Sequence, residues 1–136
     1  MLTSHCTSLE LSLALREAGY PQENALFYWY RQEEYYGAGV LQPAGEPFLD
    51  RYVAEPSFPV KRLAAAPLTS ELLEQEEMKG YTVSTTWFKE PEKHAVCQWY
   101  DTHDTDEAPY KLPCYGNTLP DAAARTYIHL RQEQLI

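Results

Sequence analysis

The stretch Tyr81–Phe88 reads YTVSTTWF, and residues 94–100 read HAVCQWY. Both segments place β-favouring residues at alternating positions, which is typical of strands. A short charged connection at residues 89–93, which contains Pro91, separates them. Two adjacent strands joined by a short turn pair in antiparallel fashion. The sequence therefore predicts a β-hairpin here, and the other elements are arranged around it.

A first helix is predicted over residues 8–18. Apolar residues recur at helical spacing at positions 11, 14, 15 and 18. The stretch TSLE at residues 7–10 matches a capping box, in which the Thr7 hydroxyl and a following carboxylate satisfy free N–H groups. Gly19 suits the position after the helix, and Pro21 prevents its continuation.

Two further helices are predicted downstream. One covers residues 69–79, with Thr69 or Ser70 as the expected N-cap. The other begins after Thr118, its expected cap, and places Pro120 in the first turn, where the missing N–H costs nothing. The apolar residues of this last helix share one face: Leu119, Ala123, Tyr127 and Leu130.

The middle third of the chain is less regular. Residues 25–30 are rich in aromatic side chains and predict a strand, with a hairpin partner around residues 35–41. Residues 42–47 contain two prolines and a glycine and predict a loop, and residues 48–53 predict a short strand. We therefore expect a single domain over residues 1–136 with an α+β fold. Its antiparallel sheet carries helices packed on one face, in the order α-β(β)(β)-α-β-β-α.

Composition and charge exclude several classes of protein. The 136 residues include 11 Lys and Arg against 20 Asp and Glu, which gives a formal net charge of −9. The hydrophobic content of 44% is too high for a generic disordered acidic tail. Nucleic acid and anionic membranes are disfavoured as direct partners, because both are bound through clustered Lys and Arg. No apolar run approaches the ~20 residues of a membrane span.

The cysteines and the first residues point to the cytoplasm. Cys6, Cys97 and Cys114 are odd in number and have no CxxC spacing. A secreted domain of this size more often carries an even disulfide framework. Residues 1–10 lack the basic start and apolar stretch of a signal peptide. We therefore expect a cytoplasmic protein.

Three short stretches resemble a known group of proteins. They are LREAGYPQ at residues 15–22, AAPLTSELLE at residues 65–74 and DAAARTYIHL at residues 121–130. In this order they resemble a loose family of small proteins encoded in phage and prophage genomes. The resemblance implies an accessory protein of a phage or mobile element that acts in the host cytoplasm. It implies no activity, since no catalytic residues of that family can be carried over.

An acidic segment follows the second strand of the hairpin. Residues 101–107 read DTHDTDE and hold four carboxylates and an imidazole, donors that suit a hard divalent cation. The spacing is not that of an EF-hand loop, whose required glycine is absent. We interpret the segment as a hydrated acidic loop. The alternative is a metal site, or a metal-dependent active site, formed by Asp101, His103, Asp104 and Asp106.

Other chemistry has little support in the residue pattern. His94 and Cys97 lie three positions apart on a predicted strand and thus point to opposite faces, which argues against joint zinc ligation. The sequence contains no GxSxG, P-loop, GxGxxG or HExxH motif. We expect no cofactor and no catalytic residue, and enzymatic activity stays open as the minority interpretation.

Aromatic residues are the most distinctive feature of the composition. Eleven Tyr, three Trp and four Phe make up 13% of the chain. Tyr is amphipathic and is enriched in protein interfaces, so exposed rings on the strands would serve as anchors for a partner. The candidate interaction surface consists of Tyr28, Tyr30, Tyr35, Tyr36 and Trp99. The competing interpretation places most of these rings in the core between sheet and helices.

The sequence thus favours a small soluble protein without enzymatic activity that binds a protein partner or itself. Two alternatives remain. One is a metal-dependent enzyme built on the acidic segment at residues 101–107. The other is an acidic decoy that occupies the basic surface of a nucleic-acid-binding protein. The decoy requires that segment to share one face with the carboxylates of the helix at residues 69–79.

Overall fold

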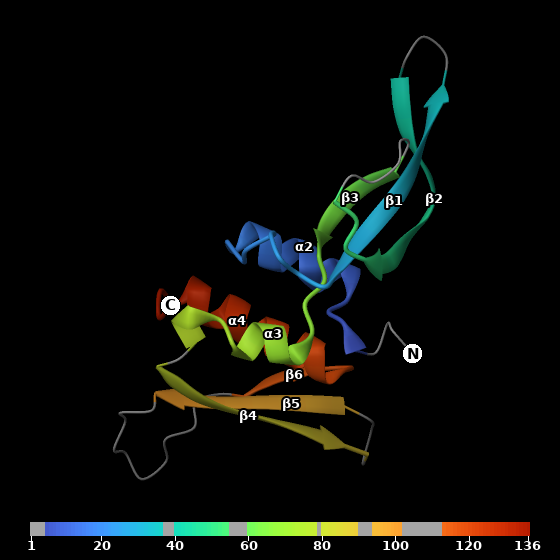
Figure 1. The fold of residues 1–136 in the computed structure, drawn as a ribbon. Helices are drawn as coiled ribbons and strands as arrows, with labels where there is room; N and C mark the ends of the chain where they lie inside the picture. The colour runs from blue at the N-terminus through green and yellow to red at the C-terminus, as the bar shows by residue number, and fades with distance from the viewer. Residues whose placement is uncertain (1–4, 37–39, 55–59, 79, 90–93, 102–112) are drawn as a thin grey trace.

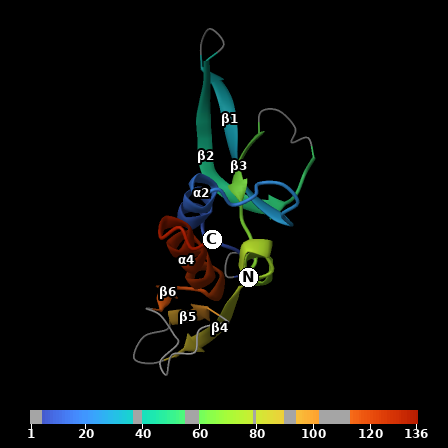
Figure 2. The same ribbon diagram turned by 90° about the vertical axis from the view of Figure 1, so that its left-hand side faces the viewer.

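The helices lie between two small antiparallel sheets in the computed structural model (Figures 1 and 2). The structure describes residues 5–36, 40–54, 60–78, 80–89, 94–101 and 113–136. The helices are α2 (Leu9–Glu17), α3 (Thr69–Leu73), the 3-10 turn η1 (Glu76–Met78) and α4 (Leu119–Gln132). The α+β class and the predicted order of elements are confirmed. The strands, however, divide between two sheets.

The first sheet has the strand order β2-β1-β3, in which β1 (Phe27–Tyr36) is central. Its partner β2 (Val40–Arg51) forms a long hairpin with it that extends away from the helices (Figure 1). The third strand is β3 (Val60–Ala65), antiparallel to β1. The predicted short strand at residues 48–53 completes β2 instead of standing alone.

The predicted loop at residues 42–47 is wrong, because this segment lies inside β2. Proline lacks the N–H that a ladder needs, yet it is tolerated on an edge strand, and β2 is an edge strand of its sheet. Gly45 has a φ of 76°, and the pairing register shifts between Tyr30 and Gln32 on the opposite strand. An irregularity of this kind absorbs the glycine without ending the strand.

The predicted hairpin at the start of the second sheet is confirmed. Strand β4 (Tyr81–Phe88) pairs in full register with β5 (His94–Asp101), from Tyr81 opposite Asp101 to Phe88 opposite His94. A strand of three residues, β6 (Cys114–Gly116), adds to the other side of β5 and has no counterpart in the sequence prediction. Residue Cys97 is buried and His94 stacks on Phe88, so the two side chains are separated as their spacing predicts.

The start of α2 differs from the prediction. Ser8 is the N-cap residue and its side chain makes no capping hydrogen bond, so the capping box at residues 7–10 does not form. The Thr7 hydroxyl instead donates to the carbonyl of Pro67 over 2.8 Å and is buried. The Thr7 hydroxyl therefore makes a tertiary hydrogen bond in place of the helix cap that the local sequence predicts. Gly19 follows the helix with a φ of 95°, as expected.

The second helix is shorter than predicted, because α3 ends at Leu73 and η1 follows after a break. Neither Thr69 nor Ser70 is its cap. The Glu71 carboxylate accepts hydrogen bonds from the N–H groups of Leu68 over 3.1 Å and Leu26 over 3.4 Å. This side chain thus ties the start of α3 to the chain before β1.

The last helix begins as its sequence predicts. The Thr118 hydroxyl accepts a hydrogen bond from the N–H of Asp121 over 3.3 Å, and Pro120 lies in the first turn. The predicted apolar face of α4 packs into the core, where Ala123, Tyr127 and Leu130 are fully buried.

The main core lies where α2, α3, η1 and α4 meet the inner face of the second sheet. It includes Leu15, Leu72, Met78, Trp99 and Tyr127. A smaller cluster within the first sheet contains Tyr28, Tyr30 and Ala65, with Phe48 packed against it. No described helix is long and apolar enough to cross a membrane.

Candidate functional site: an arginine–tyrosine cleft

A cleft with a volume of about 670 Å³ opens beside the first sheet. One wall is the turn that precedes β1, and the other is formed by the end of β2 and by β3. We name it the arginine–tyrosine cleft after its most distinctive side chains. Its lining residues are Gln22, Glu23, Asn24, Ala25, Leu26, Tyr28, Arg51, Tyr52 and Arg62.

The Arg62 guanidinium lies over two neighbouring aromatic rings of this cleft. Its carbon lies 4.7 Å from the ring centroid of Tyr28 and 5.0 Å from that of Tyr52. The two rings are 5.6 Å apart. A cation placed over aromatic faces is attracted by their negative electrostatic potential. The Arg62 side chain also donates to the carbonyl of Val53, so its position in the cleft is well defined.

The floor of the cleft is Tyr28, whose hydroxyl group fixes the opposite wall. The hydroxyl donates to the carbonyl of Gln22 over 2.7 Å and accepts from the N–H of Ala25 over 3.3 Å. Burial raises the pKa of this phenol above its usual value, and the Arg62 guanidinium opposes the shift. Tyr28 therefore stays protonated at physiological pH, and its hydroxyl holds the backbone of Gln22 and Ala25 in place by hydrogen bonds.

The rim of the cleft exposes apolar and aromatic surface. Leu26 is 57% exposed, Tyr52 50% and Val53 43%. The N–H of Tyr52 donates to the Leu26 carbonyl over 2.9 Å, which joins the two sides of the rim. The buried Tyr30 hydroxyl bonds to the backbone of both Arg51 and Val53 over 3.0 Å. These bonds fix the chain where it leaves β2, so the rim residues are presented on a supported backbone.

The charges around the turn before β1 are unevenly distributed. The arginine–tyrosine cleft contains two guanidinium groups, Arg51 and Arg62, and one carboxylate, Glu23. An adjoining cleft of about 370 Å³ lies on the other side of the turn and contains Glu23, Glu71 and Glu74. A chain with a formal charge of −9 thus has a cleft with an excess of positive charge beside an acidic one.

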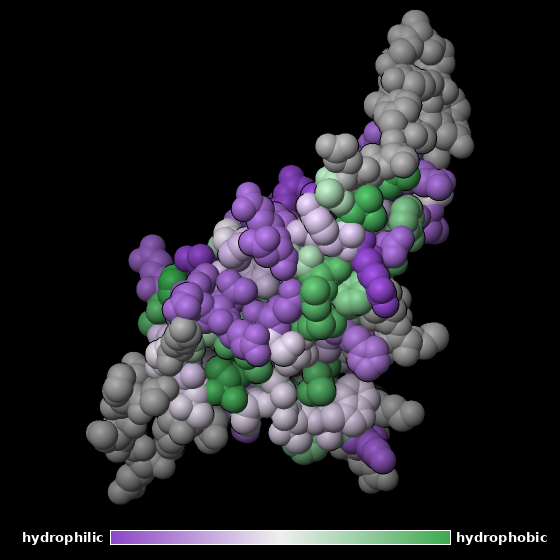
Figure 3. Space-filling model, in the orientation of Figure 1, coloured by the Kyte–Doolittle hydropathy of each residue, from purple (hydrophilic) through white to green (hydrophobic). Residues whose placement is uncertain are grey.

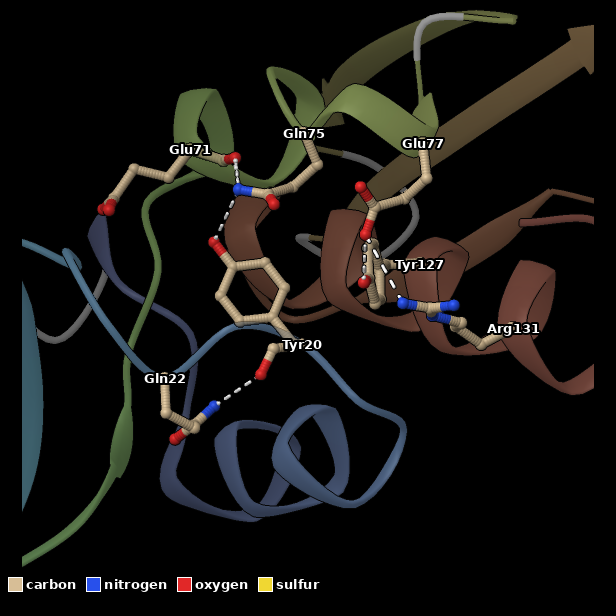
Figure 4. Close-up of polar contacts among 7 residues, drawn as sticks. All are labelled: Tyr20, Gln22, Glu71, Gln75, Glu77, Tyr127 and Arg131. Carbon is tan, nitrogen blue, oxygen red and sulfur yellow. Dashed lines mark hydrogen bonds and ion pairs between the residues drawn. The ribbon is translucent and has the colours of Figure 1, made fainter.

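Hydrogen bonds beneath the turn hold these two clefts in place (Figure 4). The Gln75 amide donates to the Tyr20 hydroxyl over 3.4 Å and to the Glu71 carbonyl over 3.1 Å. The Gln22 amide donates to the Tyr20 carbonyl over 3.0 Å, while its oxygen accepts from the N–H of Ala65 over 2.9 Å. The turn is therefore fastened both to the chain after α3 and to the end of β3.

A second group of contacts connects the same region to α4 (Figure 4). The Tyr127 hydroxyl donates to the Glu77 carboxylate over 2.9 Å, and Arg131 lies 3.5 Å from the same oxygen. The Tyr20 and Tyr127 rings meet edge to face with centroids 5.3 Å apart. Burial raises the pKa of Tyr127, and so does its hydrogen bond to the Glu77 carboxylate. These contacts stabilise the packing of Tyr20, η1 and α4, and we assign them a structural role.

Most of the predicted interaction surface lies in the core. Tyr28, Tyr30 and Trp99 are only 1%, 2% and 3% exposed. The prediction that these three rings lie on an exposed sheet face is therefore wrong. Packing explains their burial: Tyr30 stacks on Phe48, and Trp99 meets the Tyr81 ring edge to face. Only Tyr28 contributes to a site, as the floor of the cleft.

For the remaining two rings of that surface, an exposed position stays a prediction. Tyr35 and Tyr36 end strand β1, and their side chains lie outside the described part of the structure. The exposed aromatic residue at the cleft is instead Tyr52.

The acidic segment, for which a metal site was the alternative interpretation, falls largely outside the described residues. Asp101 ends β5, whereas His103, Asp104 and Asp106 belong to the undescribed residues 102–112. Within the described ranges, no group of three or more His, Cys, Asp or Glu side chains is arranged to hold a metal ion. Whether residues 102–107 share a face with the acidic side chains of α3, as the decoy hypothesis requires, stays a prediction.

Of the residues that define the cleft, sequence reasoning named Tyr28 and missed Arg51, Tyr52 and Arg62. Arg62 and Tyr28 are far apart in the sequence, and no local pattern indicates that they meet. A weak signal was present in residues 51–53, where Arg, Tyr and Val follow one another. Arg and Tyr are the residue types that dominate protein-binding hot spots.

The side chains in the cleft suit recognition better than reaction. A guanidinium remains protonated and offers five N–H donors in a fixed planar arrangement. The rest of the rim offers aromatic and aliphatic contact area. On the face shown in Figure 3, apolar side chains of the described residues form small groups separated by hydrophilic ones. Comparison of the chain with models of protein families, with curated proteins and with solved structures found no match.

Proposed function

We propose that this chain is a protein-interaction module that works without catalysis in a phage or mobile-element setting, in the host cytoplasm. We place its partner-binding site at the arginine–tyrosine cleft. One observation carries the proposal: the Arg62 guanidinium lies over the neighbouring rings of Tyr28 and Tyr52 at an open cleft with an exposed apolar rim. Tyr and Arg in such positions are enriched among the residues that dominate binding energy.

The charge of the cleft defines the chemistry of the partner. Arg51 is exposed, and Arg62 has a buried Nε without a hydrogen-bond partner among the described residues. Arg binds carboxylates through paired hydrogen bonds. The exposed surfaces of Leu26 and Tyr52 beside these cations suit an apolar side chain. The occupant that fits is an extended peptide segment of a partner protein, with a carboxylate next to an apolar residue.

Opposite charges also guide the encounter of the two proteins. The chain has a formal charge of −9 and the adjoining cleft contains Glu23, Glu71 and Glu74, so an acidic segment is repelled there and attracted to the two arginines. This arrangement favours one binding position over others and makes the affinity dependent on salt concentration.

The proposal is tested by selecting peptides from a displayed random library on the folded chain and measuring their affinity. We expect the enriched sequences to combine Asp or Glu with an aromatic or aliphatic neighbour. Tyr52→Ala should weaken binding by ten-fold or more, because it removes one of the two rings that contact the Arg62 guanidinium and part of the rim contact area. Arg51→Glu should weaken binding at low salt and less so at high salt.

Matched controls separate the cleft from general surface effects. Tyr115 is 56% exposed and lies on β6 of the other sheet, so Tyr115→Ala should leave affinity unchanged. Arg125→Glu, at an exposed position of α4, controls for the change in net charge. The proposal is wrong if Tyr52→Ala binds as tightly as the wild type, or if the selected peptides lack acidic residues.

A further inference from the structure

Two of the three cysteines are direct partners across neighbouring strands. Cys97 of β5 is opposite Cys114 of β6 in the antiparallel register, although 16 residues separate them in the sequence. Directly opposed residues of an antiparallel pair have Cα atoms ~4.5–5.5 Å apart, and their side chains point to the same face. Disulfides span Cα distances of about 4.4–6.8 Å. The backbone therefore places these two thiols within bonding reach, while both cysteines are free in this structure.

The two thiols differ in their access to solvent. Cys97 is fully buried against α4, in a cluster with Ala95 and Ala122. Cys114 is partly exposed at the edge of the sheet. The third cysteine, Cys6, is buried elsewhere and pairs through its backbone with Leu68. A reagent in solution thus meets Cys114 first, and Cys97 is reached only from within the protein.

We propose that Cys114 and Cys97 form a reversible dithiol–disulfide site that reacts with low-molecular-weight disulfides of the glutathione type. In the first step, the Cys114 thiolate attacks the small disulfide; one glutathione bonds to its sulfur and the other leaves as a thiolate, which takes up a proton. In the second step, the Cys97 thiolate attacks the Cys114 sulfur and expels the bound glutathione in the same way. The small disulfide is reduced to two thiols, and the cysteine pair is oxidised to one disulfide.

Strand β6 supplies the freedom that the bond needs. Opposed Cβ atoms in a sheet are ~4.5–5.5 Å apart, whereas a disulfide requires about 3.5–4.5 Å. The strand has three residues and lies at the edge of its sheet, so a small shift at its first residue, Cys114, costs little pairing while Gly116 stays packed against α4. A disulfide held slightly away from its preferred geometry is reduced more easily. The site is therefore reversible and does not require a permanently oxidising compartment.

The environment of Cys97 determines the rate of the second step. Burial raises the pKa of its thiol to about 11, opposed in part by a hydrogen bond with the Thr126 side chain. Only the thiolate attacks a disulfide, and its fraction rises about ten-fold per pH unit below the pKa. We therefore expect the conversion of the Cys114–glutathione adduct into the internal disulfide to accelerate about ten-fold between pH 7 and pH 8.

The experiment uses the full chain with oxidised glutathione at pH 8, followed by mass spectrometry of the intact protein and of its peptides. We expect a product two hydrogen atoms lighter than the reduced protein, with a peptide that links Cys97 to Cys114. Excess reduced glutathione should return it to the dithiol form. The cross-link constrains the unfolded chain, so the oxidised protein should have a Tm higher by on the order of 5 °C.

Three variants distinguish the roles of the cysteines. Cys97→Ala should stop the reaction at a glutathione adduct on Cys114, and Cys114→Ala should leave Cys97 unmodified in the folded protein. Cys6→Ala is the control and should form the internal disulfide as the wild type does. A wild-type protein that retains glutathione on Cys114, links Cys6 to another cysteine, or shows an unchanged or lower Tm after oxidation would overturn the proposal. These results do not depend on the partner cleft, which lies on the other sheet.

Discussion

At the level of single residues, the hydroxyl groups of the tyrosines determine much of the architecture. From the sequence these rings are candidate surface anchors, yet several of the hydroxyls bond within the protein. Tyr28 holds the turn before β1, and Tyr30 holds the chain after β2. Tyr127 connects α4 to η1 through Glu77. The same amphipathic character that suits Tyr to interfaces also lets it cross from the core to a polar group.

Replacing Tyr127 by Phe tests one of these internal bonds. The variant keeps the ring against Tyr20 and removes the hydroxyl that donates to the Glu77 carboxylate. A hydrogen bond to a charged group contributes more than one between neutral groups, so we expect a loss of about 1–2 kcal/mol in the free energy of unfolding. Urea denaturation monitored by fluorescence measures it. Tyr20→Phe is the control, because its hydroxyl makes only a 3.4 Å bond to neutral Gln75; an equal or larger loss there would contradict the assignment.

The cleft shows why the role of a single residue is difficult to predict from the sequence. Arg51, Tyr52 and Arg62 are ordinary polar or aromatic residues of a strand region, and their neighbours in the sequence give no sign of a site. Their role arises because antiparallel pairing on both sides of β1 brings β2 and β3 to the same ring, Tyr28. The cation–π contacts are thus products of the sheet and not of any local motif.

At the level of elements, the closest packing in the second sheet is between β6 and α4. A Cβ atom added to Gly116 would lie 2.6 Å from the backbone nitrogen of Ala122, closer than real Cβ contacts allow. Glycine here permits the strand to approach the first turn of the helix, rather than supplying an unusual φ angle. The short strand β6 is therefore positioned by its contact with α4 as much as by its pairing with β5.

Gly116→Ala should separate β6 from α4 and destabilise the protein. The opposing atoms belong to the backbone of the helix and cannot rotate away, so we expect a loss of about 2 kcal/mol or more in the free energy of unfolding. Gly80→Ala is the matched control, since nothing lies within 4 Å of a Cβ at that exposed position. Thermal and urea unfolding of both variants measure the difference. Equal stability of the two variants would show that the contact of β6 with α4 is not tight.

Elements with local signals were predicted well, and those that depend on pairing were not. The hairpin of β4 and β5 and the start of α4 follow from alternation and from capping chemistry, which act over a few residues. By contrast, β2 runs through two prolines because it lies at an edge, and β6 exists because β5 and α4 flank it. Neither condition is visible within the segment itself.

At the level of the whole molecule, the buried phenols couple stability to alkaline pH. Burial raises the pKa of Tyr20, Tyr28 and Tyr127, and for Tyr20 the nearby Glu71 carboxylate adds to the shift. Above pH ~10, the unfolded chain releases these protons while the folded chain retains them. The unfolded state then binds fewer protons, so the free energy of unfolding falls as the pH rises.

We expect this loss to begin near pH 10 and to approach about 1.4 kcal/mol per pH unit for each strongly shifted phenol. Urea denaturation between pH 8 and pH 11 measures it. Tyr20→Phe lacks the phenol that titrates and should show a shallower decline over the same range. A free energy of unfolding that stays constant up to pH 11 would show that these phenols are not buried as the structure places them.

The sequence by itself determined the α+β class, the order of helices and strands, the hairpin of β4 and β5, and the cap of α4. These features depend on periodicity, propensity and short-range hydrogen bonds, which are properties of a few consecutive residues. The tertiary structure alone decided which aromatic rings are buried, that Arg62 lies over two tyrosine rings, and that Cys97 faces Cys114. Burial and contact across strands depend on which elements pack together. This arrangement results from many weak contacts between residues that are far apart in the sequence.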